Sequence, residues 1–171
     1  SVGYFDSVYI DAVITVFMIL FGVNFNLYFF LLMREFKPVW KNEEVKAYIG
    51  IILTSALMIT INISHLYTGP LKAFRYAVFQ VASVITTTGY ATADFVEWPM
   101  FSQNILLFLM MVGACASSTG GGMKVARFLM MLKCIKREIV QMVHPKAVRI
   151  IRMNGKKMDQ DVLRVLNIYL M

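Results

Sequence analysis

The stretch SVITTTGYATADF, from Ser83 to Phe95, closes an apolar segment with three threonines, a glycine and a tyrosine. Its composition is typical of a buried strand, rich in β-branched residues, that ends in a glycine turn. It equally suits a backbone that presents carbonyl oxygens to a ligand, because glycine permits the backbone angles that turn carbonyls one way. The segments around it decide between the two interpretations.

The composition of the 171-residue chain favours a membrane protein over a large soluble core. Hydrophobic residues make up 58% of it, and the mean hydropathy is +0.65. Soluble globular domains are nearer about 45–50% apolar. Because the chain starts at Ser1 without a methionine and ends in the apolar NIYLM, we expect it to be a piece of a longer polypeptide.

Two apolar segments are long enough to cross a hydrocarbon core of about 30 Å at about 1.5 Å per residue. They run from Val8 to Leu32 and from Tyr48 to Leu66. The next, from Leu71 to Ile85, follows a break at Gly69 and Pro70. At about 22 Å it is too short to cross, so we expect a re-entrant half-helix, after which TTTGY returns the chain outward.

The last apolar stretch, Met100 to Leu132, is too long for one crossing and is interrupted by GACASSTGGGMK, Gly113 to Lys124. Irregular backbone at membrane depth is tolerated only inside protein or along a water-filled path. Trp98, just before this stretch, is expected to be an interfacial anchor. The predicted fold class is an all-α integral membrane protein with a helix–re-entrant pore loop–helix repeat, whose second helix is broken in mid-membrane by the Gly-rich loop.

The basic residues predict the orientation. Fifteen of the 17 lysines and arginines lie in the 34–46 linker or after Gly122, and the exceptions are Lys72 and Arg75. The positive-inside rule makes those two regions cytoplasmic and the TTTGY side external. The net charge of +7 is therefore mainly a topology signal. We expect contact with membrane lipid and no nucleic acid, since the tail has few aromatic residues to stack on bases.

A dehydrated potassium ion needs oxygen atoms from several chain segments at once, and backbone carbonyls supply them in channels. The half-helix before TTTGY would point its partly negative C-terminal end at the ion. Exposed backbone at that depth needs a function or protein cover, which disfavours the buried strand. The candidate potassium-binding residues are Thr87, Thr88, Gly89 and Tyr90.

The glycine-rich loop is predicted to be a gate. It is not a phosphate-binding loop, because Met123 separates Gly122 from Lys124 where that motif needs lysine directly after glycine. Small residues can rearrange at low steric cost, and the alternative is a helix kink with close packing. Lys124 is expected to extend to the cytoplasm, the alternative being a place near the pore. The candidate gate residues are Gly113, Ser118, Thr119, Gly120, Gly121, Gly122 and Lys124.

The remaining polar residues and the two cysteines indicate no further catalytic or metal site. Asp11 is expected to face water, and Asn24 and Asn26 to form hydrogen bonds between helices. Cys115 and Cys134 lie too far apart in the sequence to suggest a disulfide framework or a metal site. No catalytic pair or triad is evident, so we expect no enzyme and no bound cofactor.

Four stretches resemble the TrkH/KtrB potassium transporter superfamily, and its TrkH branch in particular. They are, in order, FGVNFNLYFFLL, TTTGYATADFVEWP, SSTGGGMKVARFLMMLK and HPKAV. Thr87 to Ala91 also resembles the potassium-channel signature TVGYG, with Thr88 for Val and Ala91 for the final Gly. The resemblance implies a TrkH-type membrane subunit with four non-identical repeats around one pore, of which this chain would be the fragment around the third repeat.

The resemblance also implies a division of the chain and a function. The expected parts are an outer helix ending the preceding repeat (1–33), a cytoplasmic linker (34–47), a complete repeat (48–135), a cytoplasmic segment (136–160) and the start of the next repeat (161–171). The implied function is potassium uptake across the cytoplasmic (inner) membrane, with K⁺ as the sole metal. The implied partners are a TrkA-like nucleotide-binding regulatory subunit and a second copy of the full-length protein.

Two other functions stay open at this point. One is a homotetrameric potassium-channel-like pore built from four copies of this chain, which would place four identical TTTGY segments around the pore. The other is a structural or membrane-anchoring module that conducts no ion.

Overall fold

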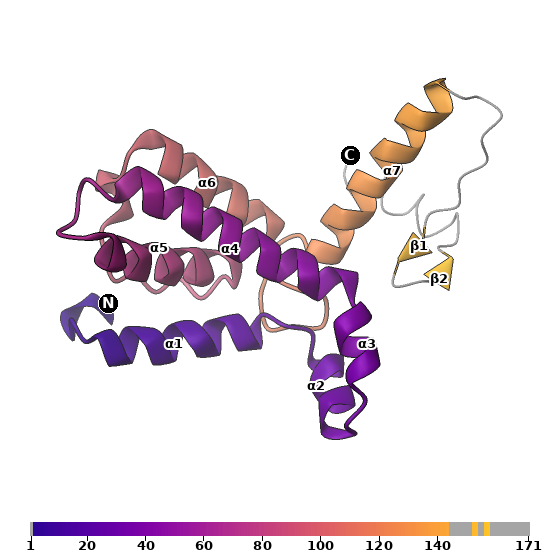
Figure 1. Cartoon of the computed structure of the whole chain (residues 1–171), viewed down its shortest axis with the longest axis horizontal. Coiled ribbons are helices and arrows are strands. Elements are labelled where there is room, and N and C mark those ends of the chain that lie inside the picture. Colours follow the sequence, from indigo (N-terminus) through magenta and orange to yellow (C-terminus); the bar gives the residue numbers. More distant parts are fainter. Residues whose placement is uncertain (1, 144–151, 154–155, 158–171) are drawn as a thin grey trace.

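The computed structural model describes residues 2–143, 152–153 and 156–157, and apart from two short strands all of the regular secondary structure in this part is helical (Figure 1). The predicted segment 161–171 and most of 136–160, including HPKAV, lie outside the described residues. The elements are η1 (Val2–Tyr4), α1 (Val8–Phe21), α2 (Phe25–Leu32), α3 (Phe36–Lys41), α4 (Glu43–Ile63), α5 (Pro70–Ile85), η2 (Phe95–Glu97), α6 (Met100–Val112), α7 (Val125–Val143), β1 (Arg152–Met153) and β2 (Lys156–Lys157). The two strands pair antiparallel, with Arg152 opposite Lys157.

Local sequence signals place the helix starts. The Asn42 side chain accepts hydrogen bonds from the backbone N–H groups of Glu44 (2.9 Å) and Val45 (3.2 Å), so α4 begins at Glu43. The prediction that this helix begins at Tyr48 was therefore five residues late. Pro70 opens α5 directly after Gly69, where its missing N–H costs nothing.

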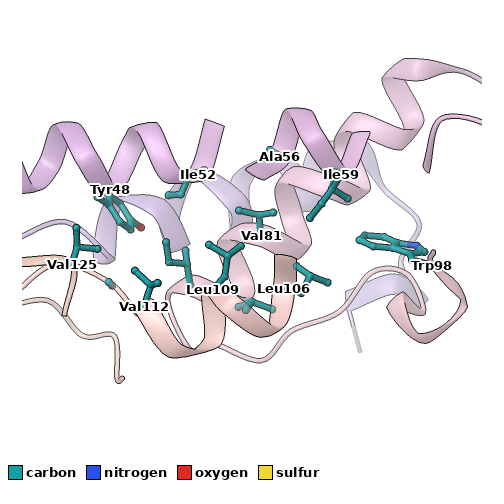
Figure 2. Close-up of a cluster of buried hydrophobic side chains, with 14 of the residues drawn as sticks. Tyr48, Ile52, Ala56, Ile59, Val81, Trp98, Leu106, Leu109, Val112 and Val125 are labelled. Atoms are coloured by element: carbon teal, nitrogen blue, oxygen red, sulfur yellow. The ribbon is translucent and has the colours of Figure 1, made fainter. Parts of the chain in front are cut away.

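The core lies between α4, α5 and α6, which Figure 1 shows side by side. One face of α4 is buried at helical spacing and packs against Val81 of α5 and Leu106 and Leu109 of α6 (Figure 2). The small residues Ala56 of α4 and Ala73 and Ala77 of α5 are buried in this core, as is usual where helices pack closely. The buried residues of α4 are Glu44, Tyr48, Ile52, Ala56, Ile59 and Ile63.

The outer faces of these helices are also apolar. Ile61 of α4 is 75% exposed, and Leu107 and Met111 of α6 are 61% and 65% exposed. Trp98, by contrast, is only 3% exposed and donates a hydrogen bond from Nε1 to the Tyr67 hydroxyl at 3.0 Å. The expectation that Trp98 lies at an interface as an anchor was wrong, because its ring closes one end of the core (Figure 2).

The predicted single helix from Val8 to Leu32 is wrong. The chain forms α1 and α2, which are bent by 93° at a break between Phe21 and Phe25. Asn24 caps α2 by accepting a hydrogen bond from the backbone N–H of Asn26 at 2.9 Å. Asn24 therefore has a local capping role in place of the interhelical one that we expected.

Helix length and composition single out α4 among the described residues. It alone is long and apolar enough to cross a membrane by itself, and α1 with α2 would add a second crossing if the bent pair counts as one span. The 16 residues of α5 correspond to about 24 Å, in line with the predicted short helix.

Gly22 tests how tightly the bend packs. A Cβ there would collide with the Tyr48 hydroxyl and lie 2.9 Å from Thr86 Cγ2. We expect Gly22→Ala to destabilise the fold by about 1–3 kcal/mol through overpacking, seen as a lower melting temperature of the purified full-length protein. Tyr48→Phe in the same background should recover part of the loss.

Gly50 supplies the matched control, because a Cβ on this helical residue of α4 meets nothing within 4 Å. Gly50→Ala should leave the melting temperature unchanged or raise it, since alanine is the better helix former by about 1 kcal/mol. Equal melting temperatures for the two alanine variants would contradict the packing at the bend.

Candidate ion-binding site

The predicted ion-binding segment follows a continuously buried stretch of the chain and is itself exposed. Residues 79–85 of α5 are all buried, and so is Thr86. Thr87, Thr88, Gly89 and Tyr90 are all exposed and form no strand. The buried-strand interpretation is therefore wrong: the four residues line an open surface at the end of a helix.

The backbone of this segment alternates in handedness. Thr87 has φ +56° and Gly89 has φ +79°, whereas Thr88 between them does not have a positive φ. In a regular strand successive residues face opposite ways, and the positive φ of Thr87 and Gly89 interrupts that alternation. Glycine adopts this conformation freely, but a β-branched residue such as Thr87 does so only when its surroundings hold it there.

Three carbonyls of the segment are available to a ligand. Within the part of the chain that the structure describes, the carbonyl oxygens of Thr87, Thr88 and Gly89 accept no hydrogen bond. The Tyr90 carbonyl accepts one from the Ser83 hydroxyl at 2.6 Å, which fixes the end of the segment to α5. Tyr90 thus has a carbonyl already engaged by the protein, unlike the other three candidates.

The threonine hydroxyls of this segment form hydrogen bonds within the protein, which fix its conformation. Thr86 Oγ1 and Thr88 Oγ1 are 2.8 Å apart and share a hydrogen bond. Thr87 Oγ1 accepts a hydrogen bond from the backbone N–H of Gly121 at 2.7 Å. The candidate ion-binding segment and the glycine-rich loop are therefore in direct contact through a threonine.

The glycine-rich loop lies beside the bend between α1 and α2 (Figure 1) and is hydrogen-bonded to it. The N–H of Cys115 donates to the Gly22 carbonyl at 3.1 Å, and the N–H of Phe25 donates to the Ser117 carbonyl at 3.1 Å. The Thr119 hydroxyl donates to the Phe21 carbonyl at 3.3 Å. Backbone groups at the break between α1 and α2 therefore form hydrogen bonds with the loop.

The other predicted gate residues hold the loop in its own shape. The Ser118 hydroxyl donates to the Cys115 carbonyl at 2.6 Å. Gly113 and Gly122 have φ +68° and +72°, and a Cβ on Gly113 would come within 2.6 Å of the Gly121 carbonyl oxygen. The expectation that Lys124 extends away to the cytoplasm was wrong, because its ammonium donates back to the Gly120 carbonyl.

A pocket of about 420 Å³ lies between α1, the candidate ion-binding segment and the loop, and its walls are mainly apolar. It is lined by Val13, Ile14, Phe17, Met18, Phe21, Thr86, Thr88, Tyr90 and Thr119. Among the described residues, no three His, Cys, Asp or Glu side chains are grouped as they are in a metal site. The oxygens available to a cation here are backbone and hydroxyl oxygens.

Sequence reasoning missed Glu44, because it placed this residue in the predicted 34–47 linker, before the start of the helix. Its side chain is buried, with 4% exposed, and Oε1 accepts a hydrogen bond from the N–H of Ala116 at 2.5 Å. One turn later, the Tyr48 hydroxyl donates to the Ile19 carbonyl at 3.2 Å. Neither residue lies near the loop in sequence, and no spacing rule connects them to it.

Asp11 was expected to face water, but the structure buries it, with 2% exposed, beside Arg75. Arg75 Nε lies 3.1 Å from Asp11 Oδ2, and Arg75 Nη2 lies 2.9 Å from Asp6 Oδ1. This ion pair joins α1 to α5, the helix that ends at the candidate site. It also neutralises one of the two basic residues on the side that the sequence predicts to be external.

Several known proteins resemble this chain in sequence and in structure. The family model described as TrkH, cation transport protein, matches residues 51–168. The Trk system potassium uptake protein TrkH of Salmonella typhimurium is 38% identical over 166 residues, which cover 95% of this chain and 34% of that protein. TrkG of Escherichia coli strain K12 is 31% identical over 166 residues, which cover 96% of this chain and 34% of that protein.

The crystal structure of the potassium transporter TrkH from Vibrio parahaemolyticus matches with a TM-score of 0.93 at 38% identity. The match covers 99% of this chain and 37% of that one. The chain therefore belongs to the TrkH cation transport protein family, a family of membrane transporters and not of enzymes, as the sequence predicted. It spans about a third of the length of the curated relatives it matches.

The contact between Thr87 and Gly121 can be tested with a near-isosteric change. Thr87→Val removes the hydroxyl that accepts the Gly121 N–H and keeps the β-branched shape. We expect the free energy of unfolding to fall by about 1 kcal/mol, measured as a lower melting temperature of the full-length protein in detergent.

Thr92→Val is the control for this change. Thr92 Oγ1 is buried and has no hydrogen-bond partner in the described part of the chain, so its loss should be neutral or stabilising. If Thr87→Val melted at or above the temperature of Thr92→Val, the hydrogen bond between Thr87 and Gly121 would contribute nothing to the stability of the fold.

Proposed function

We propose that this chain forms one wall of a potassium-conducting pore in an uptake system of the Trk type. Thr87, Thr88, Gly89 and Tyr90 are one quarter of a selectivity filter, in which backbone carbonyls replace the water around a K⁺ ion. The loop from Gly113 to Lys124 is the gate. The relatives named above are potassium uptake proteins, and this chain's share in that activity is our inference from them.

One observation carries the filter assignment: three exposed carbonyls with no partner in the described chain, on a backbone that includes a strained threonine. Strain of this kind costs about 1–3 kcal/mol and persists where the surroundings enforce it, commonly at functional sites. The carbonyl end of α5 adds a partly negative potential at the same place. These features favour a cation over an anion at the segment.

The gate assignment is supported by where the loop lies. It touches the filter segment at Thr87 and borders the pocket at Thr119, so it stands at one end of the path along the filter. Its glycines and small residues permit a second conformation at low steric cost. A helix kink used only for packing would need no contact with the filter.

The membrane arrangement follows from the apolar outer faces and the charge distribution. Exposed large apolar side chains on α4 and α6 suit lipid, and α4 is long enough to cross. We place α5 as a re-entrant helix entering from outside, the filter facing outside, and the basic 34–46 linker and tail in the cytoplasm of a multi-pass inner-membrane protein. The division into 1–33, 34–47, 48–135, 136–160 and 161–171 belongs to this proposal.

Partners belong to the same proposal. A filter with one wall needs three more, which we assign to other repeats of the full-length protein. A TrkA-like nucleotide-binding subunit would act on the cytoplasmic face, and two full-length copies would form a dimer. The competing arrangement, four copies of this chain around one pore, is disfavoured because the relatives are about three times as long as the chain.

Gly89 gives the direct test. It has φ +79°, and a Cβ added there would meet open space, so Gly89→Ser strains the backbone without a packing collision. In the full-length parent, expressed in a cell deficient in potassium uptake, we expect Gly89→Ser to abolish growth at limiting potassium or to lose selectivity for potassium over sodium.

Gly50→Ser is the matched control, because Gly50 also has open space but lies within α4. It should support growth like the unmodified protein. Full rescue by Gly89→Ser at limiting potassium, with equal protein in the membrane, would defeat the filter assignment.

A further inference from the structure

Glu44 is a buried carboxylate that belongs neither to the proposed filter nor to the gate loop itself. It lies in the first turn of α4, with 4% of the residue exposed. Burying a carboxylate away from water is costly unless it is hydrogen-bonded or paired. The partly positive N-terminus of α4 and the short hydrogen bond from Ala116 N–H, at 2.5 Å, offset that cost.

The backbone around Ala116 is held at three successive residues. Cys115 is held by the Gly22 carbonyl and Ser117 by the N–H of Phe25, and both of these are bonds between backbone groups. Ala116 between them is held by the Glu44 side chain. A side-chain anchor can be released by rotation about its own bonds, whereas the two backbone anchors require the ends of α1 and α2 to move.

The other end of the loop is anchored differently. Gly121 is held by the Thr87 hydroxyl of the filter segment. Besides its backbone and hydroxyl contacts at the bend of α1 and α2, the loop donates N–H groups to two side chains outside it, Thr87 in the filter segment and Glu44 at the start of α4. Because the acceptor at Glu44 is a carboxylate and that at Thr87 is a neutral hydroxyl, the Glu44 bond is the stronger of the two.

We propose that Glu44 is a positioning residue for the gate, which holds the loop in the conformation of this structure and sets how often it opens. This inference rests on the proposed function of the loop as the gate. A hydrogen bond to a charged group is strong enough that its loss shifts a two-state equilibrium by about tenfold or more. The loop would then spend more time open, and flux would rise without a change in the filter.

The test uses the full-length transporter in lipid vesicles or nanodiscs, with Glu44→Ala, Glu44→Gln and Glu43→Ala. Hydrogen–deuterium exchange of peptides covering 113–124 reports the loop, and rubidium flux reports the pore. We expect Glu44→Ala to speed exchange at this loop and to raise flux by about tenfold. Glu44→Gln keeps a neutral acceptor for the Ala116 N–H and should restore most of the protection.

Glu43→Ala is the matched control, because Glu43 is the adjacent carboxylate and pairs with Lys133 of α7. It should leave exchange at 113–124 as in the unmodified protein. The melting temperature of each variant shows that it is folded, and Glu44→Gln keeps the test valid if Glu44→Ala does not fold.

The outcomes separate the two ideas. Unchanged exchange in folded Glu44→Ala, or exchange raised equally by Glu43→Ala, would overturn the role of Glu44. Faster exchange with unchanged flux would leave Glu44 as the anchor of the loop and would overturn the loop's role as gate. Faster exchange with higher flux, reversed by Glu44→Gln, supports both.

Discussion

The arrangement depends on finding partners for the backbone of the glycine-rich loop. A chain that leaves helical geometry inside a protein must satisfy each freed N–H and C=O group. The loop does so with Gly22 and Phe25 at the bend of α1 and α2, with Glu44 at the start of α4, and with Thr87 at the end of α5. The bend in the first helix, the buried acid and the engaged threonine are consequences of that one requirement.

The conformation of the candidate filter segment is held by hydrogen bonds to its surroundings. Thr87 keeps a strained left-handed backbone while its hydroxyl receives the Gly121 N–H, and Ser83 holds the Tyr90 carbonyl at the other end. Asp11 and Arg75 fix α5 against α1. In the proposed pore, a movement of the loop would therefore reach the filter through one hydrogen bond.

The sequence predicted the parts that depend on local composition. The short α5, the break at Gly113, the exposed TTTGY segment and the family all followed from hydropathy, glycine placement and motif. It did not predict the bend at Gly22, because the residues that hydrogen-bond to the bend, Cys115 and Ser117, lie more than ninety positions away. The burial of Asp11 and the anchor at Glu44 were missed for the same reason: each is decided by a tertiary partner. The hydrogen bond from Lys124 to Gly120 joins residues only four positions apart, and it was missed because it depends on the irregular backbone shape of the loop.

In the proposed pore, the carbonyls of Thr87, Thr88 and Gly89 bind a dehydrated potassium ion. The most direct test of this binding is a structure of the full-length protein with thallium or rubidium in place of potassium, in which anomalous scattering locates the ion. We expect an anomalous peak in direct contact with these carbonyl oxygens. Well-ordered carbonyls with no peak beside them, or a peak elsewhere along the pore and none here, would contradict it.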